Sequence, residues 1–319
     1  MGSVNYSLVI PVYKNAESIS RLLTVLADMN QALYDKLEVV FVVDGSPDES
    51  FSLLKQHLPD MSFRAQLLAH SRNFGSFPAI RTGLAAATGN FYGVMAADLQ
   101  EPPELIQAFF FSLENNECDV AIGTRNGRSD PFMSRIASDI FWGIYRRLVV
   151  KDMPPGGVDI FGCNRVFRDH LLQLEESRSS LIALIFWLGF RRKFVAYERQ
   201  LRQEGKSSWT LSKKIDYMLD SVFAFTDYPI RLLMKIGALG SLISIGLGIG
   251  ILIARLSGFI EVPGYAATML TVLFLGALNL FGLGLVGTYA WRSYENTKQR
   301  PLSIVASKFI HIRDVDENI

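Results

Sequence analysis

The sequence predicts an α/β fold with a mostly parallel sheet, followed by a hairpin of two membrane-spanning helices. Over residues 7–124, short apolar runs alternate with segments of helical spacing, which is typical of a parallel sheet covered by helices on both faces. Two long stretches without charged residues follow near the C-terminus. The 319 residues suffice for one large domain or two modest ones, and a mean hydropathy of +0.21 is high for a soluble enzyme.

Net charge and cysteine content exclude several classes of protein. The chain has 32 basic and 31 acidic residues, so no basic excess recruits nucleic acid and no acidic excess predicts disorder. Its two cysteines, Cys118 and Cys163, are too few for a disulfide scaffold or a Cys-rich zinc site. We therefore expect reduced, buried thiols. The N-terminus lacks a charged region followed by an apolar run, so no cleaved signal peptide is expected.

Strands and helices are expected to alternate through the first part of the chain. Apolar or β-branched runs predict strands at residues 7–12, 37–43, 63–69, 91–97 and 120–124. Helical spacing predicts helices at residues 17–29, 51–58, 79–87 and 103–115. Because ligands of parallel sheets bind beyond the carboxyl ends of the strands, the polar clusters that follow the strands form the candidate site.

The first two polar clusters suit a nucleoside. A strand that ends in Pro11 and Tyr13, with Glu17 downstream, leaves a concave lip where a flat base can rest. Asp44 directly follows an apolar strand and can accept a hydrogen bond from a base N–H or a ribose hydroxyl, and Gly45 allows a sharp turn. The alternative for the second cluster is a generic turn with a helix cap.

The third polar cluster, residues 98–104, suits a divalent cation. Asp98 and Gln100 lie two residues apart in one loop, and their oxygens can reach one Mg²⁺ or Mn²⁺ ion. The alternative is a helix start, with Pro102 or Pro103 in its first turn. The sequence contains no GxGxxG and no GxxxxGK[ST] motif, so dinucleotide-binding and P-loop functions lose their main support.

The two apolar stretches are each long enough to cross a bilayer. Nineteen uncharged residues separate Lys235 from Arg255, and thirty separate Glu261 from Arg292. A hydrocarbon core of ~30 Å needs ~20 apolar residues as a helix, so we predict spans at residues 231–256 and 264–291. The alternative, a buried hairpin in a soluble core, would need a far larger protein around it.

Basic residues orient these spans. Most lie outside the hairpin turn, at Arg231, Lys235, Arg292, Lys298, Arg300 and Lys308, whereas the turn offers only Arg255, at its edge, and Glu261. The positive-inside rule therefore places both termini and the N-terminal part on the cytoplasmic side. Residues 132–150 and 209–230 carry apolar stripes beside Lys, Arg and Trp, which is typical of helices lying in the headgroup layer. Core-facing amphipathic helices are the alternative for both segments.

Glycines in both spans predict close helix packing, within one chain or between the chains of a homo-oligomer. The tail, residues 292–319, contains one or two short apolar runs, at 303–306 and 309–313, which predict strands. Such strands have unpaired edges that the sheet of a neighbouring subunit could cover. Docking of the tail on its own domain is the alternative.

The motifs, taken in chain order, resemble the family-2 glycosyltransferases of the GT-A fold. They are PVY with Glu17, DGSPD at 44–48, RNFG at 72–75, ADLQEPPE at 97–104 and GTR at 123–125. More narrowly, they resemble polyisoprenyl-phosphate glycosyltransferases, the relatives of dolichol-phosphate mannose synthase. The two spans match the bacterial, membrane-anchored branch that uses undecaprenyl phosphate. The resemblance covers nearly the whole chain and implies a GT-A catalytic domain at residues 1–208.

The resemblance implies inverting transfer of a sugar from a nucleotide sugar to a polyprenyl phosphate, at the cytoplasmic face of the inner membrane. Glucose from UDP-glucose is the preferred donor sugar. The residues implied to hold the nucleoside are Pro11, Tyr13, Glu17, Asp44 and Asp48, and those implied to hold Mg²⁺ or Mn²⁺ are Asp98 and Gln100. Those implied to bind acceptor phosphate or diphosphate are Arg125, Arg135, Ser138, Arg202, Lys206 and Ser207.

Asp159 matches a family acid that faces the reacting centre. It is either a general base or a residue that positions the acceptor or the sugar. A phosphomonoester has a second pKa near ~6 and is mostly dianionic at neutral pH, so the chemical need for a base is small.

One departure from the family pattern bears on the alternatives. Many relatives carry Asp-x-Asp before Leu-Gln, whereas Ala96 occupies the first position here, so one metal ligand is lost. A non-catalytic membrane scaffold is one alternative, and Ala96 is its only support. A processive polysaccharide synthase is another, but such enzymes usually add a Q..RW segment and more spans, and this sequence has no such segment.

Overall fold

The computed structural model describes residues 4–125, 142–143, 145–147, 149–154, 158, 160–176, 179–200, 211–257 and 264–311. The chain divides into two compact units. The first comprises Met1–Tyr217 together with Pro301–Ile319, and the second is Met218–Arg300. The chain therefore leaves the first unit and returns to it after the second.

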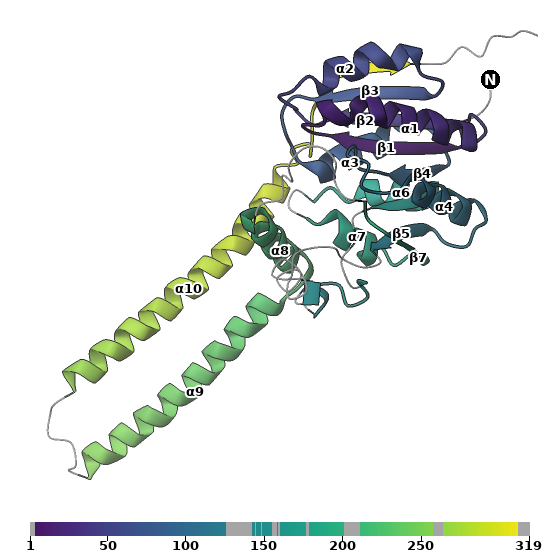
Figure 1. Ribbon diagram of the computed structural model, residues 1–319. Coiled ribbons are helices and arrows are strands. Elements are labelled where there is room, and N and C mark those ends of the chain that lie inside the picture. Colours follow the sequence, from purple (N-terminus) through teal and green to yellow (C-terminus); the bar gives the residue numbers. More distant parts are fainter. Residues whose placement is uncertain are drawn as a thin grey trace, which may run out of the picture. The chain divides into compact units, whose positions relative to one another are not determined.

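The first unit is built on a sheet whose eight described strands have the order β7-β5-β6-β4-β1-β2-β3-β8 (Figure 1). The strands are β1 (Tyr6–Val12), β2 (Leu37–Val43), β3 (Arg64–His70), β4 (Phe91–Val94), β5 (Val120–Arg125), β6 (Phe161–Asn164), β7 (Arg192–Tyr197) and β8 (Val305–His311). β6 is antiparallel to both of its neighbours and β8 is antiparallel to β3, while the other pairings are parallel. The predicted, mostly parallel α/β sheet is confirmed.

Helices cover both faces of this sheet. α1 (Ile19–Ala32), α2 (Ser50–His57) and α4 (Pro103–Glu114) contribute to one hydrophobic core with alternate residues of β1 and β2. α3 (Ser76–Ala86) packs on the opposite face and contacts α6 (Arg165–Gln173). The remaining short helices of this unit are η1 (Ala16–Ser18), η2 (Leu58–Asp60) and α7 (Leu181–Trp187).

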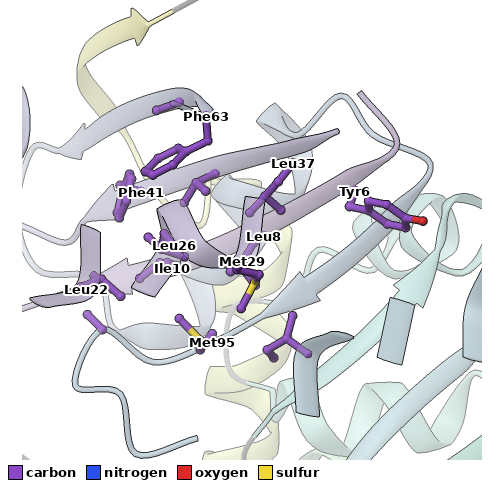
Figure 2. Close-up of a cluster of buried hydrophobic side chains, with 14 of the residues drawn as sticks. Tyr6, Leu8, Ile10, Leu22, Leu26, Met29, Leu37, Phe41, Phe63 and Met95 are labelled. Carbon is purple, nitrogen blue, oxygen red and sulfur yellow. The ribbon is translucent and has the colours of Figure 1, made fainter. Parts of the chain in front are cut away.

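Successive side chains of β1 point to opposite faces of the sheet, so they pack against different helices. Leu8 and Ile10 point toward Leu22, Leu26 and Met29 of α1 (Figure 2). Val9, between them, lies on the other face, against α3. A Cβ added to Gly83 of α3 would lie 2.2 Å from Cγ1 of Val9, so the helix sits directly on the sheet there. These helices hold the strands in place and leave the loops at the strand ends to carry function.

The structure extends the predicted sheet at both ends. The strand predicted at 91–97 ends at Val94 in the structure, and β6 and β7 had no counterpart in the prediction. The tail forms a single described strand, β8, rather than two. It pairs with β3 of the same chain, from Ala65 opposite His311 to His70 opposite Val305. The expectation that a neighbouring subunit would cover this tail is therefore not met.

The second unit contains two long helices, α9 (Tyr228–Leu256) and α10 (Tyr265–Thr297). Among the described residues, Tyr228–Leu247 and Phe274–Thr297 are long and apolar enough to cross a membrane, by length and composition. Their glycines mostly face open space. Gly282 is the exception within the described spans, since a Cβ added there would lie 3.6 Å from Leu233. Among the described glycines of these helices, most are therefore not packed against the other helix of the same chain.

The helix α8 (Leu211–Phe225) is joined to α10 through side chains of the second unit. Nη2 of Arg292 donates to Oδ1 of Asp220 at 2.6 Å, and the Arg292 guanidinium lies 5.1 Å from the centre of the Phe223 ring. This ion pair and the ring contact fix the C-terminal half of α8 against the end of α10.

Candidate active site

The loops after β1 and β2 are tied together at the carboxyl edge of the sheet, where the parallel strands end. The backbone N–H of Lys14 donates to Oγ of Ser46 at 2.8 Å, and the N–H of Ala16 donates to Oδ2 of Asp48 at 3.0 Å. The N–H of Asn15 donates to Oγ of Ser50 at 3.3 Å. The first two predicted clusters therefore form one connected surface.

Asp48 is the anchor of this connection. Besides Ala16, its carboxylate accepts hydrogen bonds from Oγ of Ser46 at 2.6 Å and from the N–H of Ser50 at 3.3 Å. Burial alone would raise the pKa of Asp48, but these hydrogen bonds outweigh burial and hold the pKa below its usual value. The ionised side chain thus organises both loops, and its contact with a nucleoside stays a prediction.

Asp44 joins the end of β2 to the RNFG turn, residues 72–75. Its Oδ1 accepts from the N–H of Phe74 at 2.8 Å, and its Oδ2 accepts from the N–H of Gly75 at 2.7 Å. Nδ1 of His70 also lies 2.8 Å from Oδ1. The Asp44 residue is 3% exposed, so these partners replace the water that a surface carboxylate would have.

Gly45 allows the RNFG turn to approach. Its φ of +57° is in the left-handed region, and a Cβ there would lie 2.3 Å from the carbonyl carbon of Arg72 and 2.4 Å from the nitrogen of Asn73. Only glycine fits a position with both constraints. The glycine of the DGSPD motif is therefore explained by the neighbouring turn as well as by its own.

The predicted base-binding residues lie at the same edge and keep accessible surface. Pro11 pairs with Val42 near the end of β1 and is half-buried. The Tyr13 ring is also half-buried and has Nζ of Lys14 5.5 Å from its centre. Glu17 is exposed in η1. Their contact with a base stays a prediction.

The loop with Asp98 is held beside the first cluster. Oγ of Ser18 donates to the carbonyl of Ala97 at 3.1 Å, which ties η1 to the residue before Asp98. The N–H of Ala96 donates to Oε2 of Glu101 at 3.3 Å, and Glu101 is 2% exposed. Asp98 itself is half-buried at the carboxyl edge. The backbone of Ala96 is thus bonded to a buried glutamate two residues before Asp98 in the sequence.

Gln100 is engaged by the segment after β7. Its Oε1 accepts a hydrogen bond from the guanidinium of Arg199, and its backbone carbonyl accepts from the N–H of Gln200 at 2.9 Å. A cation on the same amide oxygen would be repelled by the guanidinium. Among the described residues no group of three His, Cys, Asp or Glu side chains is placed to hold a metal. The half-buried Asp98 offers one carboxylate to a cation, and its role as a metal ligand stays a prediction.

The other predicted residues divide into two groups. Arg125 is the last residue of β5, half-buried and opposite Tyr197 of β7. The following lie outside the described residues, and their roles stay predictions: Arg135, Ser138, Asp159, Arg202, Lys206 and Ser207. Sequence reasoning missed His70, Thr82 and Arg199. The available signal was a histidine that follows an apolar run and lies two residues before Arg72 of RNFG.

Comparison with known proteins identifies the family. Residues 7–174, more than half of the chain, match glycosyl transferase family 2. The chain belongs to this family. The match runs from β1 through α6, so it includes the loops after β1, β2, β3 and β4, whereas the segment after β7 lies beyond it.

Relatives of this family-2 glycosyltransferase align over nearly its whole length. The putative glycosyltransferase CsbB of Bacillus subtilis is 32% identical over 98% of this chain and 94% of its own. An uncharacterised glycosyltransferase of Synechocystis is 30% identical over 95% of each chain. A bactoprenol glucosyl transferase of Shigella phage SfX is 27% identical over 95% of this chain and 99% of its own. The similarity therefore extends past the family domain, through the two long helices to the region of β8.

Proposed function

We propose that this glycosyltransferase transfers a sugar, glucose from UDP-glucose, with inversion to a polyprenyl phosphate such as undecaprenyl phosphate. The observation that carries the proposal is the joining of four loops at one edge of the sheet, residues 13–17, 44–48, 72–75 and 96–101. The full-length similarity to proteins named bactoprenol glucosyl transferase supports the acceptor and the sugar.

The nucleoside is held by the first three loops in this proposal. The base rests on Pro11 and Tyr13, with Glu17 and Asp48 at the border. Within the described chain, Oδ2 of Asp44 accepts one hydrogen bond, from Gly75, whereas a carboxylate oxygen accepts two. The remaining acceptor direction suits the N3–H of uracil or a ribose hydroxyl.

Asp98 would hold Mg²⁺ or Mn²⁺ beside the diphosphate, and Gln100 would orient Arg199 there. Gln100 could itself bind the ion only if Arg199 moved away from its amide oxygen. When bound, such a cation neutralises the charge that develops on the departing nucleoside diphosphate. A single protein carboxylate is sufficient because these hard cations take their remaining ligands from phosphate oxygens and water. The guanidinium of Arg199 lies at the same loop and adds a positive charge there.

The transfer step forms one bond and breaks one. An oxygen of the acceptor phosphate forms a bond to the anomeric carbon, and UDP leaves from the opposite side with the bonding electron pair. Since the acceptor is mostly dianionic, no proton has to be removed from it. Arg125, Arg135 and Ser138 receive the acceptor phosphate, Arg202, Lys206 and Ser207 close on the diphosphate, and Asp159 positions the reacting groups or acts as a base.

The acceptor comes from the membrane in this proposal. α9 and α10 cross the inner membrane, with the catalytic domain and both termini on the cytoplasmic side and the segments at 132–150 and 209–230 at its surface. The end of α10 is typical of a membrane interface, since Nζ of Lys298 lies 5.0 Å from the ring of Trp291 and 4.4 Å from that of Tyr294. The open glycine faces favour a homo-oligomer formed through these helices.

The test uses membranes that contain the protein, undecaprenyl phosphate and a panel of nucleotide sugars. The panel includes UDP-glucose, UDP-galactose, UDP-GlcNAc, GDP-mannose and UDP-aminoarabinose, and mass spectrometry of the lipid identifies the product. We expect a glucosyl phospholipid with UDP-glucose in the presence of Mg²⁺ or Mn²⁺. Absence of any glycosylated lipid with every donor would overturn the proposal, while a different sugar would correct the donor alone.

A further inference from the structure

A chain of buried hydrogen bonds leads from Asp44 to the C-terminal tail. Oδ1 of Asp44 lies 2.8 Å from Nδ1 of His70, and Nε2 of His70 lies 3.0 Å from Oγ1 of Thr82. Oγ1 of Thr82 lies 2.7 Å from Oγ of Ser303. The four side chains come from the end of β2, the end of β3, the middle of α3 and the residues before β8. Ser303 is 221 positions from Thr82 in the sequence.

The donors and acceptors of this chain are mutually consistent. An ionised Asp44 can only accept, so Nδ1 of His70 donates its hydrogen to it. Nε2 of a neutral imidazole then accepts from the hydroxyl of Thr82, which in turn accepts from the hydroxyl of Ser303. The His70 side chain is fully buried, so water cannot replace these partners without a rearrangement. Each link thus fixes the direction of the next.

The backbone holds the tail at the same place. The N–H of Ser71 donates to the carbonyl of Ile304 at 2.9 Å, and Val305 pairs with His70. A register shift falls between Ala69 and His70, directly beside these contacts. Ile304 and Val305 therefore lie beside Ser71 and His70, where β3 ends, while Ser303 contacts Thr82 of α3.

His70 also packs against the RNFG turn itself. Its ring meets the Phe74 ring edge to face, with 5.5 Å between the centres, and the Arg72 guanidinium lies 4.0 Å from the centre of the same Phe74 ring. The N–H of Phe74 donates to Asp44, as does Nδ1 of His70. One imidazole thus fixes both the carboxylate and the turn that the carboxylate binds.

We propose that His70, Thr82 and Ser303 are positioning residues of the nucleotide site, which orient Asp44 so that it distinguishes the donor base. The inference rests on the proposed function, in which Asp44 contacts the nucleoside. A carboxylate with three fixed donors keeps one acceptor direction, and loss of one donor lets it rotate or accept water instead. Selectivity for the base therefore depends on the hydroxyl of Ser303, a residue that follows α9 and α10 in the sequence.

The experiment measures binding of UDP and CDP to the full-length protein in detergent by calorimetry. Uracil presents an N3–H donor to a carboxylate, whereas N3 of cytosine is an acceptor, so the ratio of the two dissociation constants reports on Asp44. Thr82→Val and Ser303→Ala each remove one hydroxyl of the chain. Ser307→Ala is the matched control, because Ser307 lies on the same strand β8 and is exposed.

We expect Thr82→Val and Ser303→Ala to weaken UDP binding by about 3- to 10-fold, the effect of one net hydrogen bond. CDP binding should change less, so the preference for UDP falls, while Ser307→Ala leaves both constants unchanged. His70→Leu should lose more than His70→Asn, since the asparagine amide can still donate to Asp44. Thermal unfolding of each variant shows whether the fold is kept. If Thr82→Val is destabilised, the comparison of UDP and CDP binding is made with Ser303→Ala instead.

The outcomes separate this inference from the proposed function. If the unaltered protein fails to bind UDP, the proposed donor is wrong and the inference falls with it. If it binds UDP but Ser303→Ala and Thr82→Val keep its affinity and its preference over CDP, the inference is overturned and the proposed function stands. An equal loss of UDP and CDP binding would also overturn the inference, because it indicates a purely structural role.

Discussion

Replacing Gly45 with alanine tests how the loops of the site depend on one another. The residue has a φ of +57°, and a left-handed conformation costs a residue with a Cβ about 1–2 kcal/mol. The added Cβ would also lie 2.3 Å from the Arg72 backbone, far inside van der Waals contact. The RNFG turn must then move away from Gly45, although two of its N–H groups are bonded to Asp44.

The size of the effect follows from what the movement breaks. A hydrogen bond to a charged group contributes about 1.5–3 kcal/mol, so losing both bonds to Asp44 together with the strain gives a destabilisation of about 4 kcal/mol or more. Gly189→Ala is the matched control. Gly189 has a φ of +72°, but the nearest atom to an added Cβ is 3.9 Å away, so only the strain applies.

The assay is urea denaturation of both full-length variants in detergent, followed by far-UV circular dichroism, together with UDP binding. We expect Gly45→Ala to unfold at clearly lower urea than Gly189→Ala and to lose UDP binding. Equal stability of the two variants, to within about 1 kcal/mol, would refute the expected contribution of the contact between Gly45 and the RNFG turn to the free energy of unfolding. Retained UDP binding by Gly45→Ala would mean that the turn does not shape the site.

Three further perturbations have defined outcomes. Asp98→Asn should abolish glycosylated-lipid formation while the exposed control Asp28→Asn stays active, and substantial turnover by Asp98→Asn in added Mg²⁺ or Mn²⁺ would refute the assigned role. Burial raises the pKa of the Cys118 and Cys163 thiols, so iodoacetamide should label neither in the native protein and both in denaturant, as read by peptide mass spectrometry. Because the pKa of Asp48 lies below its usual value in the folded protein, its contribution to stability is present above that usual value and is lost as the pH falls through the lower, folded-state pKa. Asp48→Asn should therefore reduce the loss of thermal stability on acidification, and an unchanged pH profile would contradict this.

Local patterns in the sequence were enough to predict the parallel half of the fold. The strand predicted at 37–43 became β2 with the same bounds, and the strand predicted at 7–12 became β1 with one more residue. These strands are buried on both faces, so their signal is strong and independent of partners. The polar loops that follow them could be predicted for the same reason, since they directly follow those strands in sequence.

Long-range pairing escaped prediction because its signal is divided between distant segments. β8 is exposed along most of its length, and its pairing with β3 is what joins the tail to the sheet of the first unit. β6 is four residues long and antiparallel to its neighbours, so neither period nor length identified it.

The same distinction applies to the site. The carboxylates Asp44, Asp48 and Asp98 were identified by residue type and place in a motif, but not by their partners. Sequence alone determined that these acids follow parallel strands and therefore lie at one edge of the sheet. Only the tertiary structure shows that Asp48 joins two loops by hydrogen bonds. It also shows that His70, Thr82 and Ser303 form a chain of hydrogen bonds that ends at Asp44. The physical reason is that a hydrogen bond depends on where two atoms meet in space, and the Ser303 hydroxyl lies beside Thr82 of α3 in a chain whose β8 pairs with β3.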